Sequence, residues 1–506
     1  MFAQISSGVT LGINACPISI EADISRGLPQ IQIVGLPDAS INESRERVRA
    51  AIKASGFELP LGRIIVNMAP ADLRKEGTHF DLPIAIGILL ASGQIKKPEQ
   101  NYWFLGELSL NGQLRPTNGV LPITAAAKEQ GINGIIVPKE NANEAALIEG
   151  IEVYAANSLQ DVANLLSSEQ EKAKYFIPTQ KLQIDDLEAQ FGPDFKYVKG
   201  QYQAKRALEI AAAGGHNILF VGEPGGGKSM LAQCLPSILP PLSKEMALDI
   251  TKVYSVAGLL KNMNSFFIKE RPFRAPHHSI SGAGLIGGGS SPKPGEVSLA
   301  HNGVLFLDEL AEFDKKTLDN LRQPIESGEV IISRARFSVK YPSRFLLIAA
   351  CNPSTGTNKV HSKKLIISAP LWDRFGLIVW VPPLKPTELM KFNPEDQENS
   401  KQIKLRVLKA WNKQIERFKN LALPTNNASM GPKEIKEFCK LDVAAEELLK
   451  QAVVSLALTG RTYDHVLRTA RTIADLSETT FDALLQEEHI AEAIQYRVSQ
   501  EALLSK

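Results

Sequence analysis

Residues Leu219–Ser229 read LFVGEPGGGKS, an apolar run followed by a glycine-rich loop that ends in Lys-Ser, and Met230–Leu235 continues with a helical pattern. This is the GxxxxGK[ST] pattern between a strand and a helix. Glycines allow consecutive backbone N–H groups to face inward, and the helix N-terminus adds positive potential, so the loop predicts a phosphate cradle for ATP. We expect Lys228 to contact the β- and γ-phosphates and Ser229 to bind Mg²⁺. The predicted nucleotide-binding glycines are Gly222, Gly225, Gly226 and Gly227.

Two carboxylates follow a second apolar run. Val304–Leu307 reads VLFL and leads directly into Asp308 and Glu309. Asp308 is expected on the Mg²⁺ side, usually through water, and Glu309 as the general base for an attacking water. A third apolar run, Phe345–Cys351, ends at Asn352, which is suited to orient that water. The pattern predicts ATP hydrolysis rather than nucleotide binding alone.

The composition is that of an ordinary globular protein. The chain has 506 residues, 44% hydrophobic and 22% charged, which excludes disordered, collagen-like and coiled-coil classes and indicates about three domains. A net charge of +2 neither demands nor excludes a polyanionic partner. The 4 cysteines form no CxxC pair, so a cysteine-rich zinc site and a disulfide framework are excluded and a reducing compartment is expected.

No segment has the pattern of a membrane span. The longest apolar run, Leu82–Ala91, contains Pro83 and Gly87 and is about half the length that a spanning helix needs. The first residues carry no basic region before a hydrophobic stretch, so no secretory signal is expected. We therefore predict a cytoplasmic protein that makes no membrane contact.

The chain divides into four parts by its periodicity. Residues 1–165 read as a compact α/β domain, 166–196 as a polar linker, 197–385 as a second α/β block rich in glycine loops, and 386–506 as almost entirely helical.

Within the first domain, the pattern predicts strands at 31–34 and 63–67 with a helix over 42–55 between them. A second helix is predicted over 82–92, with Asp81 as its N-cap.

Four strings carry a resemblance to a known family. They are RAPHHS at 274–279, PGEVSLAHNGVLFLDEL at 294–310, LRQPIE at 321–326 and ARTIADL at 470–476. With them the chain resembles, over essentially its whole length, the Mg-chelatase-like AAA+ ATPases of the YifB/ComM family. The resemblance implies an AAA+ P-loop αβα core and a helical lid of the Mg-chelatase C-terminal type. It also implies a hexameric motor of the kind that promotes DNA branch migration during natural transformation.

The same resemblance assigns further residues. Asn352 is implied to be sensor 1, and Arg374 an arginine finger donated to the ATP of the neighbouring subunit. Arg468 is the first choice for sensor 2, with Arg461 second; both belong to the helical C-terminal region. Gly376 stands where family members usually have an aspartate, and no cysteines follow Asn352, so no zinc is carried over.

The N-terminal domain resembles the Lon protease fold of the ribosomal S5 type through Gly106–Leu114 and Gly134–Asn141. Lon needs a serine nucleophile and a lysine base, but the corresponding stretches, 76–81 and 118–122, contain neither. Thr78 and His79 might suggest hydrolase chemistry but lack a base partner, so we expect the domain to bind nucleic acid or to assist ring assembly rather than to hydrolyse peptides.

Two insertions carry candidate DNA contacts. A hairpin is predicted over 329–341 with Arg334, Arg336 and Lys340, and a glycine-rich loop is predicted over 281–295 with Lys293. Flexible cations bind phosphates without reading bases, so salt-sensitive, sequence-independent contacts are expected. A hairpin with merely solvated charges remains the alternative.

His277 and His278 resemble metal ligands but have no third ligand nearby in the sequence, so structural hydrogen bonding is expected.

These observations favour an ATP- and Mg²⁺-dependent hexameric DNA motor, a helicase or branch-migration translocase that acts on single-stranded and branched DNA in natural transformation or homologous recombination. Homo-oligomerisation and contacts with recombination proteins are expected. Two alternatives remain, an AAA+ remodelling adaptor that acts on protein partners and a magnesium-chelatase subunit.

Overall fold

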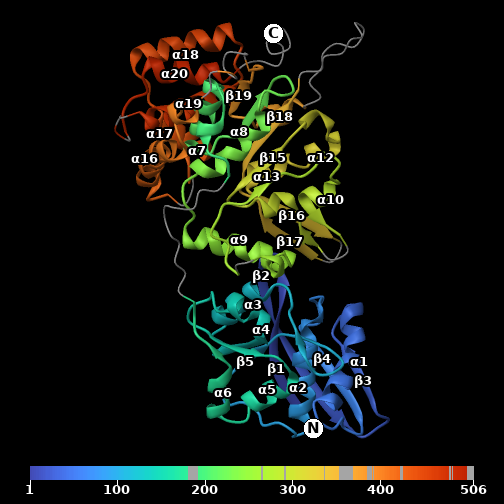
Figure 1. Ribbon diagram of the computed structural model, residues 1–506. Coiled ribbons are helices and arrows are strands. Elements are labelled where there is room, and N and C mark those ends of the chain that lie inside the picture. Colours follow the sequence, from blue (N-terminus) through green and yellow to red (C-terminus); the bar gives the residue numbers. More distant parts are fainter. Residues whose placement is uncertain are drawn as a thin grey trace.

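The computed structural model describes residues 1–180, 192–263, 266–289, 292–334, 337–352, 368–384, 393–421, 425–477 and 482–497, together with 390 and 480. Two sheets and a group of C-terminal helices organise these residues (Figure 1). The predicted α/β class and the helical C-terminal part are confirmed. None of the described helices is long and apolar enough to cross a membrane.

The first sheet has eight strands in the order β10-β9-β8-β5-β1-β2-β4-β3. The strands are β1 (Phe2–Leu11), β2 (Asn14–Ser25), β3 (Gln30–Val34), β4 (Arg63–Ala69), β5 (Tyr102–Phe104), β8 (Gly134–Pro138), β9 (Glu152–Ala156) and β10 (Phe176–Ile177). β1 and β2 form a long antiparallel hairpin, and β2 also pairs with β4 in antiparallel register. The remaining pairs are parallel, apart from β9 with β10.

Helices pack on this sheet through their apolar faces. α1 (Ala39–Ala54) is amphipathic and begins at Asp38, whose side chain accepts from the Ile41 N–H. α2 (Asp81–Ala91) is apolar on nearly all sides and is buried at every position except Leu90, and α3 (Val120–Glu129) packs on β1 and β2. The remaining helices beside the sheet are α4 (Lys139–Ala145), α5 (Leu159–Leu165) and α6 (Glu169–Tyr175).

Asp81 does not cap α2, contrary to the sequence prediction. It is the first helical residue, and no side chain caps this helix. Both oxygens of its carboxylate instead accept hydrogen bonds from the guanidinium of Arg47, with N–O distances of 2.7 and 3.0 Å. The carboxylate is fully buried, and burial raises its pKa in spite of this partner. A charge-assisted pair with a guanidinium is stronger than a capping hydrogen bond, which explains the side-chain direction.

Part of the predicted linker is structured. Ser168 caps α6, and β10 adds to the edge of the first sheet beside β9. Lys172, on α6, lies over the rings of Tyr102 and Tyr154, which fixes the helix against the sheet. The rest of the linker range includes 181–191, which lies outside the described residues.

The second sheet is fully parallel and has the order β12-β15-β18-β11-β19. Its strands are β12 (Phe273–Arg274), β15 (Val304–Leu307), β18 (Leu346–Cys351), β11 (Ile218–Val221) and β19 (Leu377–Trp380). Every residue of β11, β15 and β18 is buried, as expected for a parallel sheet covered on both faces. All carboxyl ends of these strands lie at one edge of the sheet, which is where polar groups meet.

The C-terminal helices pack beside this sheet. They are α16 (Ser400–Phe418), α17 (Pro432–Phe438), α18 (Val443–Ser455), α19 (Gly460–Leu476) and α20 (Glu487–Gln495). α16 and α19 contact α7 (Tyr202–Gly214) and share its apolar core. Arg417 on α16 and Asp475 on α19 form a fully buried ion pair at 2.6 Å.

The two sheets are joined through α9 (Lys244–Ala257), which packs on α3 (Figure 1). Apolar residues of both elements belong to one core. Two hydrogen bonds reinforce the contact: Ser255 donates to the buried carboxylate of Glu144 at 2.5 Å, and the Gly119 N–H donates to the Ser255 carbonyl at 3.1 Å.

Candidate nucleotide-binding site

The glycine-rich loop lies between β11 and α8 (Lys228–Cys234), as predicted. Gly225 and Gly227 have φ values of 82° and 84°, a region that side-chain-bearing residues rarely adopt, and a Cβ on either would meet no atom within 4 Å. Lys228 is largely buried, and its ammonium donates to the carbonyls of Gly222 at 2.9 Å and Glu223 at 2.7 Å. Burial lowers the pKa of this ammonium, while the charge of Asp308 opposes that effect.

The acidic end of β15 contacts the glycine-rich loop directly. The Ser229 hydroxyl donates to Oδ2 of Asp308 at 2.6 Å. β15 is separated from β11 only by β18, so both residues emerge at the carboxyl edge of the same sheet. Residues predicted from two separate motifs thus form one cluster.

Glu309 has an unusual backbone. Its φ is 49°, a left-handed conformation that a non-glycine residue adopts at a cost, and its own N–H donates to Oδ1 of Asp308 at 2.9 Å. Its carboxylate contacts Nδ1 of His278 at 3.4 Å. The sequence predicted only structural hydrogen bonding for the two histidines. His277 does bond to the Ser279 hydroxyl at 2.8 Å, whereas His278 contacts the predicted catalytic base.

Asn352 follows β18, between the strands that carry the loop and Asp308. The Gly222 N–H donates to the carbonyl of Cys351 at 3.2 Å, so Asn352 is the next residue after a direct contact with the phosphate loop. The following residues, 353–367, lie outside the description.

Arg374 and Arg461 meet on one carboxylate. Arg374 lies between α14 (Ala369–Trp372) and β19, and Arg461 is near the start of α19. The guanidinium of Arg374 pairs with Oε1 of Glu326 on α13 (Arg322–Ser327), and Arg461 approaches the same oxygen at 3.7 Å. Glu326 was not predicted as a site residue, although it lies in one of the family strings.

This arginine pair lies at the amino edge of the parallel sheet. The Arg374 carbonyl accepts from the side chain of Asn217 at 3.1 Å, and Asn217 directly precedes β11. The phosphate loop follows the 4 residues of β11. At ~3.3 Å per residue, the two ends of this strand are about 13 Å apart. Arg374 therefore lies at the opposite edge of the sheet from the phosphate loop of its own chain.

Arg468 has different surroundings. It lies near His216, whose pKa falls to about 3, chiefly through burial and further through the charge of Arg468. Burial also lowers the pKa of Arg468 itself, and its Nε is buried without a partner among the residues that the structure describes. Arg461 is half exposed and approaches the glutamate that Arg374 contacts, whereas Arg468 is partly buried and forms no ion pair with that glutamate among the described residues.

The predicted DNA contacts lie on two elements that the structure places near the first sheet. The hairpin is β16 (Glu329–Arg334) and β17 (Phe337–Pro342). Lys340 is exposed and lies 3.9 Å from Glu329, while the backbone of Lys340 packs against Gly12 of the β1–β2 hairpin. Lys293 is on β14 (Lys293–Pro294). The side chain of Arg334 and all of Arg336 lie outside the described residues.

The residues present fit ATP and Mg²⁺. The buried ammonium of Lys228 donates hydrogen bonds to two carbonyls of its own loop. Phosphates would lie in the open space over Gly225 and Gly227, against backbone N–H groups. The hydroxyl of Ser229 and the carboxylate of Asp308 are hard oxygen donors of the kind that Mg²⁺ prefers.

Comparisons with known proteins agree with this geometry. Residues 194–389 match the family model "Magnesium chelatase, subunit ChlI", residues 20–141 match "Subunit ChlI of Mg-chelatase", and residues 397–497 match "Magnesium chelatase, subunit ChlI C-terminal". The competence protein ComM of Haemophilus influenzae is 43% identical over 98% of this chain and 97% of its own length. The uncharacterized protein YifB of Escherichia coli is 41% identical over 99% of the chain and 98% of its own length.

The chain belongs to the YifB/ComM family of Mg-chelatase-like AAA+ ATPases. Similarity to magnesium chelatase itself is weaker and partial. The magnesium-chelatase 38 kDa subunit of Cereibacter sphaeroides is 27% identical over 37% of this chain. The YifB and ComM relatives, in contrast, match the first sheet as well as the ATPase core.

Proposed function

We propose that this YifB/ComM protein hydrolyses ATP at the site formed by the glycine loop, Asp308 and Glu309. The single observation that supports this most strongly is the 2.6 Å hydrogen bond between Ser229 and Asp308, since it joins the phosphate loop to the acidic strand end. Bound Mg²⁺ would neutralise charge on the phosphates and orient them. Lys228 would bind the β- and γ-phosphates, Glu309 would accept the proton of the attacking water, and Asn352 would orient that water.

We further propose that the catalytic pocket is shared between subunits. Arg374 lies at the amino edge of its own sheet, so its guanidinium would act on the ATP of a neighbouring chain in a homo-oligomeric ring, a hexamer. Because Arg461 contacts the same glutamate as Arg374, we favour Arg461 over Arg468 as the second arginine supplied across the interface. Ring assembly would then complete the active site.

The proposed work of the cycle is movement on single-stranded and branched DNA, as a helicase or branch-migration translocase. This proposal is supported by full-length similarity to a competence protein and by the cations of the β16–β17 hairpin and β14. The process would be natural transformation or homologous recombination, with recombination proteins as partners and the cytoplasm as the location. The Lon-like N-terminal part, residues 1–165, would assist by binding nucleic acid or stabilising the ring around the 197–385 core and the 386–506 lid.

The proposal is tested by measuring ATP turnover with and without single-stranded and forked DNA, and branch migration on a synthetic four-way junction. We expect turnover that rises with DNA, requires Mg²⁺ and disappears in Lys228→Ala. Turnover that ignores DNA, together with specific retention of a protein client and no DNA binding at low salt, would favour the remodelling adaptor instead.

A further inference from the structure

The main chain that carries Arg374 is held by side chains from three other parts of the chain. Residues 373–375 directly follow α14, so their carbonyls lie beyond that helix and need hydrogen-bond partners from elsewhere. Each of the three carbonyls accepts from a different side chain. The donors are His465 to Asp373 at 3.0 Å, Asn217 to Arg374 at 3.1 Å, and Arg497 to Phe375. The segment is thus fixed through its backbone, and the guanidinium of Arg374 is not needed to anchor it.

The ring of His465 is a neutral donor. The carbonyl of Asp373 can only accept, so Nε2 of His465 carries the ring proton. The pKa of His465 falls to about 3, chiefly through burial and further through the charges of Arg497 and Arg468. The ring is therefore uncharged near pH 7. An uncharged donor can hold this backbone in the midst of several arginines without repelling them.

One face of α19 makes this contact and two others. Arg461, His465 and Thr472 stand at positions i, i+4 and i+11 of the helix, which fall on one side of it. Arg461 approaches Glu326 at 3.7 Å, and the Thr472 hydroxyl lies 2.7 Å from Nε2 of His216. At 1.5 Å per residue, Arg461 and His465 are ~6 Å apart along the helix axis. This helix therefore sets the spacing between Arg461 and the segment that carries Arg374.

The contact of Arg374 with Glu326 is the weaker of its two attachments. The carboxylate of Glu326 is 55% exposed, and solvent screens an ion pair at such a position. The Nε of Arg374 is buried and has no hydrogen-bond partner among the described residues. The guanidinium can thus exchange the glutamate for phosphate oxygens without any movement of the backbone that His465 holds.

We propose that His465 is a positioning residue for Arg374, which fixes the main chain of residues 373–375 so that the guanidinium reaches the ATP of the neighbouring chain. This inference rests on the proposed sharing of the catalytic pocket. Because α19 also carries Arg461, the same contact sets the distance between the two arginines. A misplacement of about 1 Å in a catalytic group can cost ~10²-fold in rate. Loss of the His465 contact should therefore slow hydrolysis in the neighbouring pocket and leave ATP affinity unchanged.

The test places the phosphate loop and the positioned arginine in different chains. Arg374→Ala supplies an intact loop and is mixed with Lys228→Ala, which supplies an intact arginine. The mixture is repeated with Lys228→Ala/His465→Leu or Lys228→Ala/His465→Gln in place of Lys228→Ala. Leucine has no donor, whereas the amide of glutamine can still donate to a carbonyl. Lys228→Ala/His489→Leu is the matched control, because His489 is another histidine of the C-terminal helices and its Nδ1 accepts from the Gln486 N–H at 3.0 Å.

We expect turnover of the mixture to be at least about tenfold lower with Lys228→Ala/His465→Leu than with Lys228→Ala. The His465→Gln and His489→Leu versions should retain most of the turnover. Rings of the same mass should form in every mixture. His465→Leu with an intact loop should bind a fluorescent ATP analogue with wild-type affinity.

Turnover undiminished by His465→Leu would overturn the role of His465 alone. So would an equal loss in the His489→Leu mixture, or loss of ring formation or of ATP-analogue binding in His465→Leu, since each would show a general structural effect. If Lys228→Ala itself fails to restore turnover to Arg374→Ala, the shared pocket is wrong and the role of His465 falls with it.

Discussion

Arg374 and Arg461 both contact Oε1 of Glu326, although one precedes a strand of the parallel sheet and the other begins a C-terminal helix. Arg374 is 12% exposed and Arg461 is 50% exposed. The shared carboxylate holds two guanidiniums close together on a face remote from the chain's own phosphate loop. Such a paired cationic group is suited to the phosphates of a neighbouring subunit.

Removing either arginine should reduce turnover without removing ATP binding. An arginine supplied to a phosphoryl group in trans is worth ~10³–10⁵ in rate, so Arg374→Ala should lose at least about a thousandfold. Arg461→Ala should lose less, because its contact with Glu326 is longer and more exposed. Turnover and binding of a fluorescent ATP analogue are measured in parallel. Arg45→Ala, on α1, is a control; wild-type turnover in Arg374→Ala would refute the role.

Glu309 should be needed for ATP hydrolysis but not for ATP binding. Glu309→Gln keeps the size of the side chain but cannot accept a proton, so we expect ATP affinity to be retained and turnover to fall by about 10²–10⁴-fold. Lys228→Ala should lose binding as well as turnover. If Glu309→Gln hydrolyses ATP at the wild-type rate, another group must activate the water.

His278 should restrain the base. Its Nδ1 lies 3.4 Å from the Glu309 carboxylate, and its segment leads into α10 (Gly282–Ile286) and Lys293, where DNA contacts are proposed. We expect His278→Ala to raise DNA-independent turnover several-fold and to reduce stimulation by DNA. His277→Ala is the matched control because its ring bonds to Ser279 instead. Lower turnover in His278→Ala, with stimulation unchanged, would show that the histidine orients Glu309 rather than restraining it.

The sequence was sufficient to predict the residues that are contiguous with a strand end. The glycine loop, Asp308 and Asn352 follow buried apolar runs, and the parallel sheet brings those run ends to one edge. Contacts made between distant surfaces could not be predicted in this way. Glu326 contacts Arg374 and Arg461 only because segments far apart in the sequence pack together. Asp81 pairs with Arg47 rather than capping its own helix.

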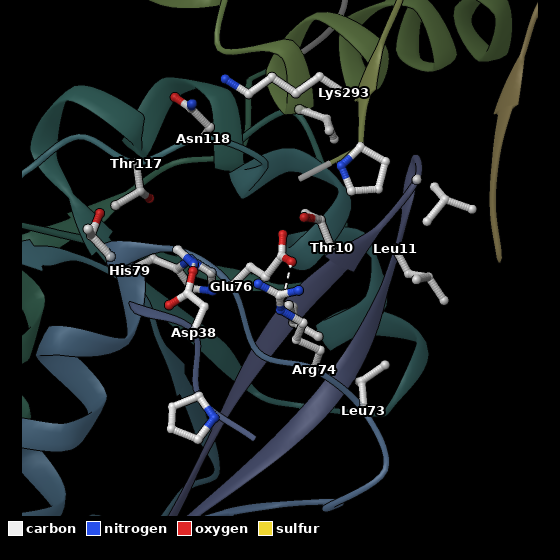
Figure 2. Close-up of a pocket in the computed structure, with 18 of the residues that line it drawn as sticks. Thr10, Leu11, Asp38, Leu73, Arg74, Glu76, His79, Thr117, Asn118 and Lys293 are labelled. Atoms are coloured by element: carbon white, nitrogen blue, oxygen red, sulfur yellow. Dashed lines mark hydrogen bonds and ion pairs between the residues drawn. The ribbon is translucent and has the colours of Figure 1, made fainter. Parts of the chain in front are cut away.

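The cavity of about 650 Å³ between the first sheet and the ATPase core shows the same limit (Figure 2). The resemblance to Lon pointed to the stretches 76–81 and 118–122, but the absence of serine and lysine left them without an expected catalytic role. Only the packing of α9 against α3 brings Lys261 to a cavity that Thr117 and His79 also line. Periodicity and motifs carry no information about that docking, because it depends on the shapes of two independently formed surfaces.

A buried charge network should stabilise the C-terminal helices. Asp475 is fully buried between Arg417 and Arg471, at 2.6 and 3.2 Å. Asp475→Ala leaves two buried guanidiniums facing each other and should lower the free energy of unfolding by roughly 3–5 kcal/mol. Urea denaturation measures the change. Glu446→Ala, which removes an exposed ion pair with Lys450, should cause no measurable loss; equal effects in the two variants would contradict the network's importance.

Stability should fall in mild acid. Burial lowers the pKa of His301 to about 4 and that of His216 to about 3, whereas an unfolded histidine titrates near ~6.5. Because these pKa values are lower in the folded state, the free energy of unfolding is highest above about pH 6.5. It decreases as the pH falls toward 4, by ~1.4 kcal/mol per pH unit for each histidine. The thermal midpoint of His216→Gln should therefore depend less steeply on pH than that of the wild type. Parallel curves would show that His216 does not titrate on unfolding.

Whether neighbouring chains complete each other's pocket is tested most directly by mixing two inactive variants. Lys228→Ala keeps its arginines but lacks the phosphate contact, and Arg374→Ala keeps the phosphate loop but lacks the finger. Random mixing should restore about a quarter of the wild-type turnover, since that share of interfaces pairs an intact loop with an intact arginine. If the mixture stays as inactive as its components while still forming rings, or if dilution to single chains leaves wild-type turnover unchanged, the pocket is not shared.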